Sequence, residues 1–198
     1  MRRRLSVITM NPPKQIKDKK TMADLIKKTK VVPFINTGTE LVPKWTQIKK
    51  STTFTLSMNP QTKTFDFISS ETPQNEIDSY QPSLSQSLTM FKDEPDYRAI
   101  FDMLFNRSTG KDAHRDALIA FYKEKGSYTP AGETDSVPCY KAWKIDALVT
   151  INQMDTVNEN IDFDLALNEI TNGAVTLNGS GEPTFIKGSF EGDTFTAA

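Results

Sequence analysis

The chain of 198 residues is long enough for one domain with a substantial hydrophobic core, or at most for two small domains. No apolar run approaches the roughly 20 residues of a membrane-spanning helix, and the N-terminal segment lacks the apolar stretch of a signal peptide, so we expect a non-secreted protein without a membrane partner. The only cysteine is Cys139 and the only histidine is His114, which excludes an intrachain disulfide and metal sites built on several of these residues.

The net charge of −1 conceals two segments of opposite charge. Residues 1–30 hold ten Lys and Arg against two Asp, whereas residues 31–198 hold fourteen Lys and Arg against twenty-three Asp and Glu. This division predicts a basic N-terminal arm on an acidic body. We favour a solvated tail for the arm. The alternatives are a segment that docks on an acidic neighbour or on nucleic acid and, for residues 1–21, an upstream extension before a start at Met22.

The first strand signals follow the basic arm. Val31–Ile35 predicts a short strand, and Asn36-Thr-Gly38 predicts a turn after it. The next strand is expected to begin within Leu41–Ile48, where Trp45 is a large candidate for the core.

Two later segments, residues 50–58 and 82–90, alternate strictly between apolar and polar residues. Because successive side chains of a strand point to opposite faces, this pattern predicts two half-buried strands. Their apolar faces carry Phe54, Leu56, Met58, Leu84, Leu88 and Met90. Their polar faces carry Thr53, Thr55, Ser57, Ser83, Ser85, Ser87 and Thr89.

The segment between these two strands, residues 59–81, is far longer than the about two to five residues of a hairpin loop. Asn59-Pro60 predicts a turn, residues 64–68 predict a short aromatic strand, and Glu71-Thr-Pro73 predicts a bend. This long arm has little apolar surface with which to fold alone, so we expect it to contact another molecule and to become ordered there. The candidate contact residues are Asn59, Lys63, Phe65, Phe67, Ile68, Glu71, Glu76 and Tyr80.

Asp93-Glu-Pro-Asp96 predicts the start of a helix. Proline suits the first helical position, and acidic residues suit the positive end of the helix dipole. One apolar stripe follows at helical spacing, and we expect it to pack on a sheet. The stripe contains Tyr97, Ile100, Phe101, Leu104 and Phe105. Residues 106–110 end the helix.

The last third of the chain predicts further antiparallel strands. The expected segments are a buried strand at 116–122, a loop at 123–138, a long strand at 140–151, its hairpin partner at 161–167, a tight turn at Asn172-Gly173 and a last short strand at 174–177. We expect one domain over residues 31–187, followed by a flexible C-terminal tail at 188–198. The fold class is mainly β, an antiparallel β-sandwich or partly open barrel with one flanking α-helix.

No group of residues predicts catalysis or a cofactor. His114 lies in a charged loop without a nucleophile motif, and Cys139 is expected to be an inert buried or half-buried thiol. Asp162-x-Asp164 lacks the glycine and the further ligands of a calcium loop. We therefore expect neither an enzyme nor a metal site.

Four segments carry a family resemblance. They are residues 45–65 (WTQIKKSTTFTLSMNPQTKTF), 80–97 (YQPSLSQSLTMFKDEPDY), 140–145 (YKAWKI) and 173–177 (GAVTL). In this order they resemble the first strand, the second strand with the helix start, and the closing strands of the major tail proteins, or tail tube proteins, of long-tailed, non-contractile bacteriophages. The likeness covers roughly residues 31–187, and it rests on local phrases and their order rather than on a catalytic signature.

The resemblance implies a structural protein of the virion tail, present in the host cytoplasm during assembly. Members of this family form hexameric rings that stack into a tube, which encloses the tape measure protein and conducts DNA during ejection. The implied partners are further copies of the chain, the tape measure protein, the tail terminator and the distal tail or baseplate proteins. The arm at 59–81 would contact the adjoining ring, and the Ser/Thr faces would line the lumen or a subunit seam. An acidic body would repel DNA phosphates, so passing DNA would not bind specifically.

Two alternatives remain open at this point. The tube protein of a contractile tail or injection device would have the same fold and assembly, and a neighbouring gene for a sheath protein would indicate it. A monomeric β-sandwich that binds carbohydrate or protein would form neither rings nor tubes at any concentration.

Overall fold

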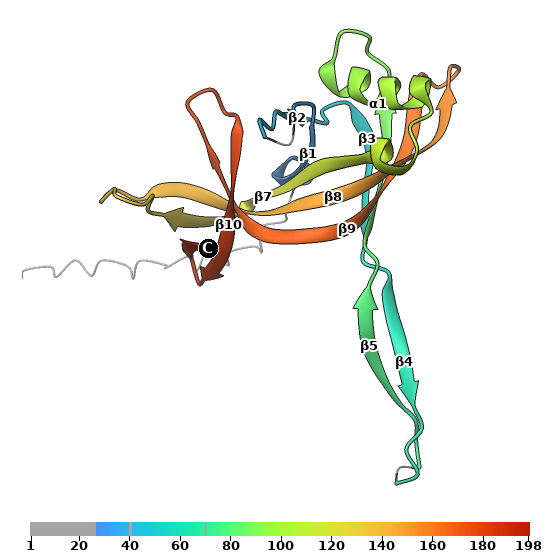
Figure 1. Ribbon diagram of the computed structural model, residues 1–198, viewed down its shortest axis with the longest axis vertical. Coiled ribbons are helices and arrows are strands. Elements are labelled where there is room, and N and C mark those ends of the chain that lie inside the picture. Colours follow the sequence, from blue (N-terminus) through green and yellow to red (C-terminus); the bar gives the residue numbers. More distant parts are fainter. Residues whose placement is uncertain (1–26, 40, 70) are drawn as a thin grey trace, which may run out of the picture.

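The computed structural model describes residues 27–39, 41–69 and 71–198. Most of the predicted basic arm, and the alternative start at Met22, lie outside the described residues. Within them the chain is mainly β, with one α-helix packed on a curved sheet that closes partly into a barrel (Figure 1). The fold class predicted from the sequence is confirmed.

Most strands and helices are joined by short connections. The exception is the link between β3 and β6, which contains the hairpin of β4 and β5. In chain order the elements are η1 (Lys28–Lys30), β1 (Val31–Asn36), β2 (Trp45–Gln47), β3 (Ser51–Ser57), β4 (Pro60–Phe65), β5 (Gln74–Tyr80), β6 (Ser83–Thr89), α1 (Pro95–Asn106), η2 (Gly110–Ala113), β7 (His114–Tyr128), β8 (Val137–Asp155), β9 (Asn160–Leu177), β10 (Pro183–Glu191) and β11 (Thr194–Ala197).

The sheet closes on itself at one end. β7, β8, β9 and β10 pair antiparallel in sequence order, and β11 pairs with β10 and also with β7. The pairing of β11 with β7 is parallel and places Phe195 opposite Tyr128. Because this circuit returns to its first strand, the five strands form a small barrel. Cys139, Ala174 and Phe195 are buried in one cluster at this end.

The other end of the sheet stays open and is covered by α1. β6 adds to the free edge of β9, and β3 adds to β6. The main core lies between these strands and the helix, where Ile100 and Met103 of α1 pack with Leu84 and Leu88 of β6 and Phe163 of β9. The core therefore holds the helix on one face of the sheet and leaves the opposite face of β3, β6 and β9 outside it.

A buried carboxylate anchors the start of α1. Asp96 is 1% exposed, and its two oxygens accept hydrogen bonds from the backbone N–H groups of Lys49 and Tyr97, both at 2.9 Å. These donors compensate the desolvation of the charge. They also join the helix to the connection between β2 and β3.

The helix lies where the sequence predicted it, but one of the five residues predicted to pack on the sheet is exposed. Pro95 is the first helical residue, and Arg107 in a left-handed conformation ends the helix. Ile100 is buried, and Tyr97, Phe101 and Leu104 pack partly buried against the core. Phe105 is 73% exposed, so its assignment to the core face is wrong. Met103 takes the buried position in the last turn.

The segment 59–81 forms a two-stranded antiparallel hairpin of β4 and β5 that projects away from the body (Figure 1). A bulge lies between Gln61 and Thr62. The aromatic strand predicted at 64–68 begins earlier and ends at Phe65. The strands pair within a single chain, which differs from the expectation that the arm needs a partner to form structure.

The C-terminal prediction is wrong in two places. Asn172-Gly173 is not a tight turn but lies within β9, where a Cβ at Gly173 would overlap the backbone of Ile186 in β10. Residues 188–198, assigned to a flexible tail, instead belong to β10 and β11, with Phe195 buried. Glycine at 173 is thus required by the close approach of the neighbouring strand rather than by a turn.

Two further boundaries differ from the sequence expectations. The loop expected at 123–138 is shorter, because β7 continues to Tyr128 and β8 begins at Val137. The second strand contains only Trp45–Gln47, and Leu41 is exposed.

Candidate functional site

The seven Ser and Thr residues predicted on the outer strand faces come together on one surface. The register of β3 with β6 sets Thr53 opposite Ser87, Thr55 opposite Ser85 and Ser57 opposite Ser83. Directly opposed residues of antiparallel strands share a face. The pairing of β6 with β9 extends this face to Asn160, Asp162 and Asp164. We call these residues, with Thr89, Thr150 and Gln153, the polar face.

Hydrogen bonds between side chains connect the polar face across its strands. The hydroxyl of Ser87 donates to Asp162 at 2.5 Å and accepts from the amide of Asn160 at 2.7 Å. Gln153 of β8 donates to the other oxygen of Asp162 at 2.6 Å. Asn152, beside it on β8, donates to Asp164 at 2.7 Å. Both carboxylates are thus held at the surface among neutral polar groups, and the face as defined contains no Lys or Arg.

This surface ends in two unpaired strand edges. Among the described residues, β3 pairs only with β6, so its outer edge is open. On the opposite side, β7 begins at His114, which pairs with Leu148. In the part of the chain that the structure describes, residues 149–155 of β8 therefore have β9 on one side and no strand on the other. An open edge presents unpaired backbone N–H and C=O groups and is a ready site for pairing with another chain.

The eight residues predicted as arm contacts all lie on the projecting hairpin or at its base. Asn59 adopts a left-handed conformation with φ 43°, and its amide donates to the carbonyl of Gln81 at 3.0 Å and to Ser83 Oγ at 3.1 Å. This side chain therefore fixes the point where the hairpin leaves the sheet.

The far half of the hairpin exposes apolar groups. The rings of Phe65 and Phe67 stack with centroids 5.6 Å apart, and Lys63 Nζ lies 5.1 Å from the Phe65 ring centroid. Ile68, next to Phe67 in the sequence, is exposed, and so is Ile77, which pairs with Thr62 nearer the base of the hairpin. The sequence reasoning missed Ile77, although its place among polar residues of a strand was a signal. Glu71, Glu76 and Tyr80 are exposed as well.

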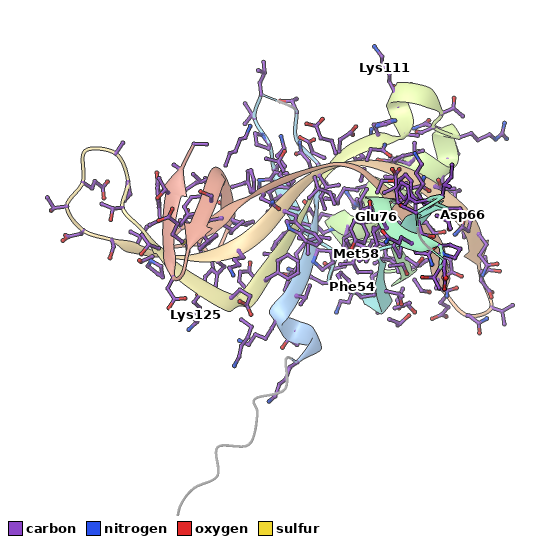
Figure 2. All side chains as sticks on the ribbon, turned by 90° about the horizontal axis from the view of Figure 1, so that it is seen from below. Phe54, Met58, Asp66, Glu76, Lys111 and Lys125 are labelled. Atoms are coloured by element: carbon purple, nitrogen blue, oxygen red, sulfur yellow. The ribbon has the colours of Figure 1, made fainter. Side chains whose placement is uncertain are left out.

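β3 itself is less buried than its alternation predicted. Phe54 is 37% and Met58 39% exposed, and only Leu56 of the apolar face packs partly buried against the core. Figure 2 shows Phe54 and Met58 on the side of the molecule from which the hairpin projects, with Asp66 and Glu76 marking the hairpin. The cause is the position of β3 at the end of the sheet, where no further strand shields its side chains.

The single histidine and the single cysteine do not form a reactive pair. His114 is not in a loop as expected, because it begins β7, where its Nδ1 lies 3.0 Å from Asp146 Oδ1. Cys139 is fully buried, as predicted, and burial raises the pKa of its thiol. In the described part of the chain, no group of three or more His, Cys, Asp and Glu is placed to hold a metal ion, and no helix is long and apolar enough to cross a membrane.

Comparison with known proteins gives no match to any family model and none to the curated proteins.

Proposed function

We propose that this chain is a tail tube protein of a long-tailed bacteriophage, which assembles into hexameric rings that stack into a tube. The observation that carries the proposal is the open sheet formed by β3, β6, β9 and residues 149–155 of β8. It has a polar face on the side opposite to the helix and an unpaired edge at each end. A sheet of this kind is complete only when further copies extend it.

The strand directions support ring closure. The four strands alternate in direction from β8 through β9 and β6 to β3, because each pairing is antiparallel. Rotation about a ring axis preserves the direction of each strand along that axis. The β3 edge of one copy would therefore meet the β8 edge of the next in antiparallel orientation. Such a head-to-tail contact closes into a ring when the rotation divides a full turn.

The polar face supports a water-filled lumen. In a closed ring, α1 and the core lie outside the barrel and the polar face lines its interior. The Ser, Thr and Asn side chains keep this wall wet, and Asp162 and Asp164 give it negative charge. Both carboxylates would repel DNA phosphates, so DNA moves through the tube without binding to its wall. The tape measure protein occupies the same lumen during assembly.

The hairpin supports stacking. It leaves the body along the direction of β3 and β6 (Figure 1), which is the direction of the proposed ring axis, and it exposes Phe67, Ile68 and Ile77. Head-to-tail stacking of rings is an open contact and generates a filament. The tail terminator and the distal tail or baseplate proteins would cap its two ends in the virion.

Electron microscopy of the purified protein at increasing concentration tests the proposal. We expect rings and then tubes of uniform width with a central channel. A protein that stays monomeric at every concentration would contradict the proposal and favour a binding module.

The role of the hairpin is tested on a second sample. Replacement of residues 61–79 by a short Gly-Ser linker should leave the body folded, because among the described strands β4 and β5 pair only with each other. We expect an unchanged circular dichroism spectrum apart from the lost strands, rings in the micrographs and no tubes. Tubes of normal length would show that stacking depends on another surface.

A further inference from the structure

The exposed apolar residues of β3 point to the same face of the sheet as the core. Leu56 lies opposite the buried Leu84, and Phe54 lies opposite the buried Gln86. Directly opposed residues share a face, so Phe54 and Leu56 face the helix side of the sheet. Met58, the residue directly after the end of β3, follows in the same alternation. Phe54 and Met58 extend the apolar face of the core to the end of the sheet and remain 37% and 39% exposed, respectively.

A groove lies at the other edge of the same sheet and on the same face. It has a volume of about 630 Å³ and runs between the end of α1, the connection Arg107–Gly110 and residues 148–153 of β8. Its apolar wall contains Met103, Leu104, Val149 and Ile151. Val149 and Ile151 lie opposite the buried Leu165 and Phe163 of β9, which places them on the helix side.

We propose that this groove is the receptor for the apolar side chains of β3 from a second copy of the chain, with Phe54 as the main anchor. The inference rests on the proposed ring for its geometry. A strand added to the free edge of β8 would lie beside Val149 and Ile151, and its helix-side residues would project toward Met103 and Leu104. On β3 these residues are Phe54 and Leu56, with Met58 directly after the end of the strand.

The contact joins two different surfaces of the chain. One copy contributes its β3 edge, and the next copy contributes its groove. After the first contact the pair keeps one free surface of each kind, a groove on one copy and a β3 edge on the other, and assembly continues until a ring closes. Both partners lose exposed apolar area in the contact, which favours association. Backbone hydrogen bonds along the paired edges then set the register.

Two single variants each disable one side of the contact. Phe54→Glu places a charge on the anchor and leaves the groove intact. Ser108→Trp fills the groove, of which Ser108 is a lining residue, and leaves β3 intact. Phe105→Glu is the matched control, because Phe105 lies on α1, is 73% exposed and does not line the groove. Circular dichroism establishes that each variant is folded.

Mass photometry and electron microscopy of the full chain measure the result. Loss of a central aromatic anchor typically costs 2 kcal/mol or more at an interface, so we expect Phe54→Glu and Ser108→Trp each to weaken self-association about 30-fold or more. Phe105→Glu should assemble as the wild type does. An equimolar mixture of Phe54→Glu and Ser108→Trp should form a dimer and no larger species, because only one intact groove can meet one intact β3.

The outcomes separate this inference from the proposed function. Rings and tubes from Phe54→Glu at wild-type concentrations would overturn the docking site and leave the tube function standing. Head-to-tail oligomers that depend on Phe54 but never form tubes would support the docking site and overturn the tube function. A wild-type protein that is monomeric throughout overturns both. A mixture that forms no dimer would overturn the head-to-tail pairing of these two surfaces.

Discussion

Gln86 occupies a core position without a hydrogen-bond partner. It lies between Leu84 and Leu88 on the buried face of β6 and is 3% exposed. Among the described residues, neither its Oε1 nor its Nε2 has a partner. Strand alternation assigns this position to the apolar face, but alternation alone does not say whether a polar side chain there finds a partner. An unpaired buried amide lowers the stability of the folded state.

We expect Gln86→Met to stabilise the protein by about 1–3 kcal/mol, the usual cost of an unsatisfied buried polar group. Methionine has nearly the volume and shape of glutamine, so the core should accept it. Urea denaturation monitored by circular dichroism measures the change in the free energy of unfolding. The control is Gln81→Met, at an exposed position, which should alter stability by less than about 0.5 kcal/mol. A destabilised Gln86→Met would mean that the amide has a partner in solution.

Asp155 organises the turn between β8 and β9. Its carboxylate accepts hydrogen bonds from the backbone N–H of Asn158 at 3.0 Å, from the side-chain amide of Asn158 at 2.6 Å and from the backbone N–H of Val157 at 2.8 Å. These hydrogen bonds, the backbone bond of Asn158 first, lower the pKa of Asp155 in the folded protein. All of them favour the ionised form.

A carboxyl with a lowered pKa stabilises the folded state only where it is ionised. The contribution is fully present above the unfolded pKa of about 3.9 and is lost as the pH falls through the lower folded value. We expect the melting temperature of Asp155→Asn to lie below that of the wild type near neutral pH and to approach it in acid. Thermal melts in steps from about pH 6 to pH 2 measure the difference. A difference that stays constant over this range would contradict the assignment.

At the scale of the elements, α1 has the clearest sequence signal. Its buried face differs from the predicted stripe in the last turn, where Met103 is buried and Phe105 is exposed. Spacing alone made Phe105 a core residue and overlooked Met103. Met103 lies three residues after Ile100, on the same side of the helix, and both are buried against the sheet, whereas Phe105 is exposed near the end of the helix. The curvature of the sheet depends on pairings that span most of the chain, and a local window of sequence does not contain them.

We expect Ile100→Ala to destabilise the protein by about 2–5 kcal/mol, because Ile100 is fully buried between the helix and the sheet. Phe105→Ala removes a larger side chain from the same helix, but Phe105 is exposed, and its effect should stay below about 0.5 kcal/mol. Chemical denaturation of both variants measures the contrast. Equal losses would show that Phe105 packs on the body and that the face of the helix is misplaced.

The sequence predicts a strand correctly where the pattern of side chains within that strand is sufficient. It fails where the extent of the strand depends on another strand far away in the sequence. The faces of β6 follow from period-two alternation, and the polar residues of β3 align with them as expected. β9 was divided in two because Asn172-Gly173 is a strong turn signal, and its role as a close-approach site depends on Ile186 in a later strand. The free edge of β8 likewise depends on where β7 starts to pair, which no local pattern specifies.

At the scale of the whole molecule, charge is divided along the sequence, with Lys and Arg in excess over residues 1–30 and Asp and Glu in excess over residues 31–198. We expect a protein that lacks residues 1–26 to bind duplex DNA weakly at physiological salt, because the remainder is strongly acidic and its polar face carries two carboxylates. Fluorescence anisotropy with labelled DNA over a range of salt concentrations measures this. Replacement of both Asp162 and Asp164 by lysine is the positive control and should raise affinity in a salt-dependent way. Tight binding by the shortened protein, with a steep salt dependence, would contradict an inert lumen.

The barrel closed by β11 has a consequence for the route by which the chain folds. β11 reaches β7 across all of β8, β9 and β10, so closure brings together segments that are far apart in the sequence. Contacts of this kind form slowly, because the entropy of the intervening chain is lost before they stabilise anything. Until then the edges of β7 and β10 are open to other chains, in addition to the edges of β3 and of residues 149–155 of β8, which stay unpaired in the described part of the folded chain. During folding at high protein concentration, closure of the barrel within one chain therefore competes with strand pairing between chains.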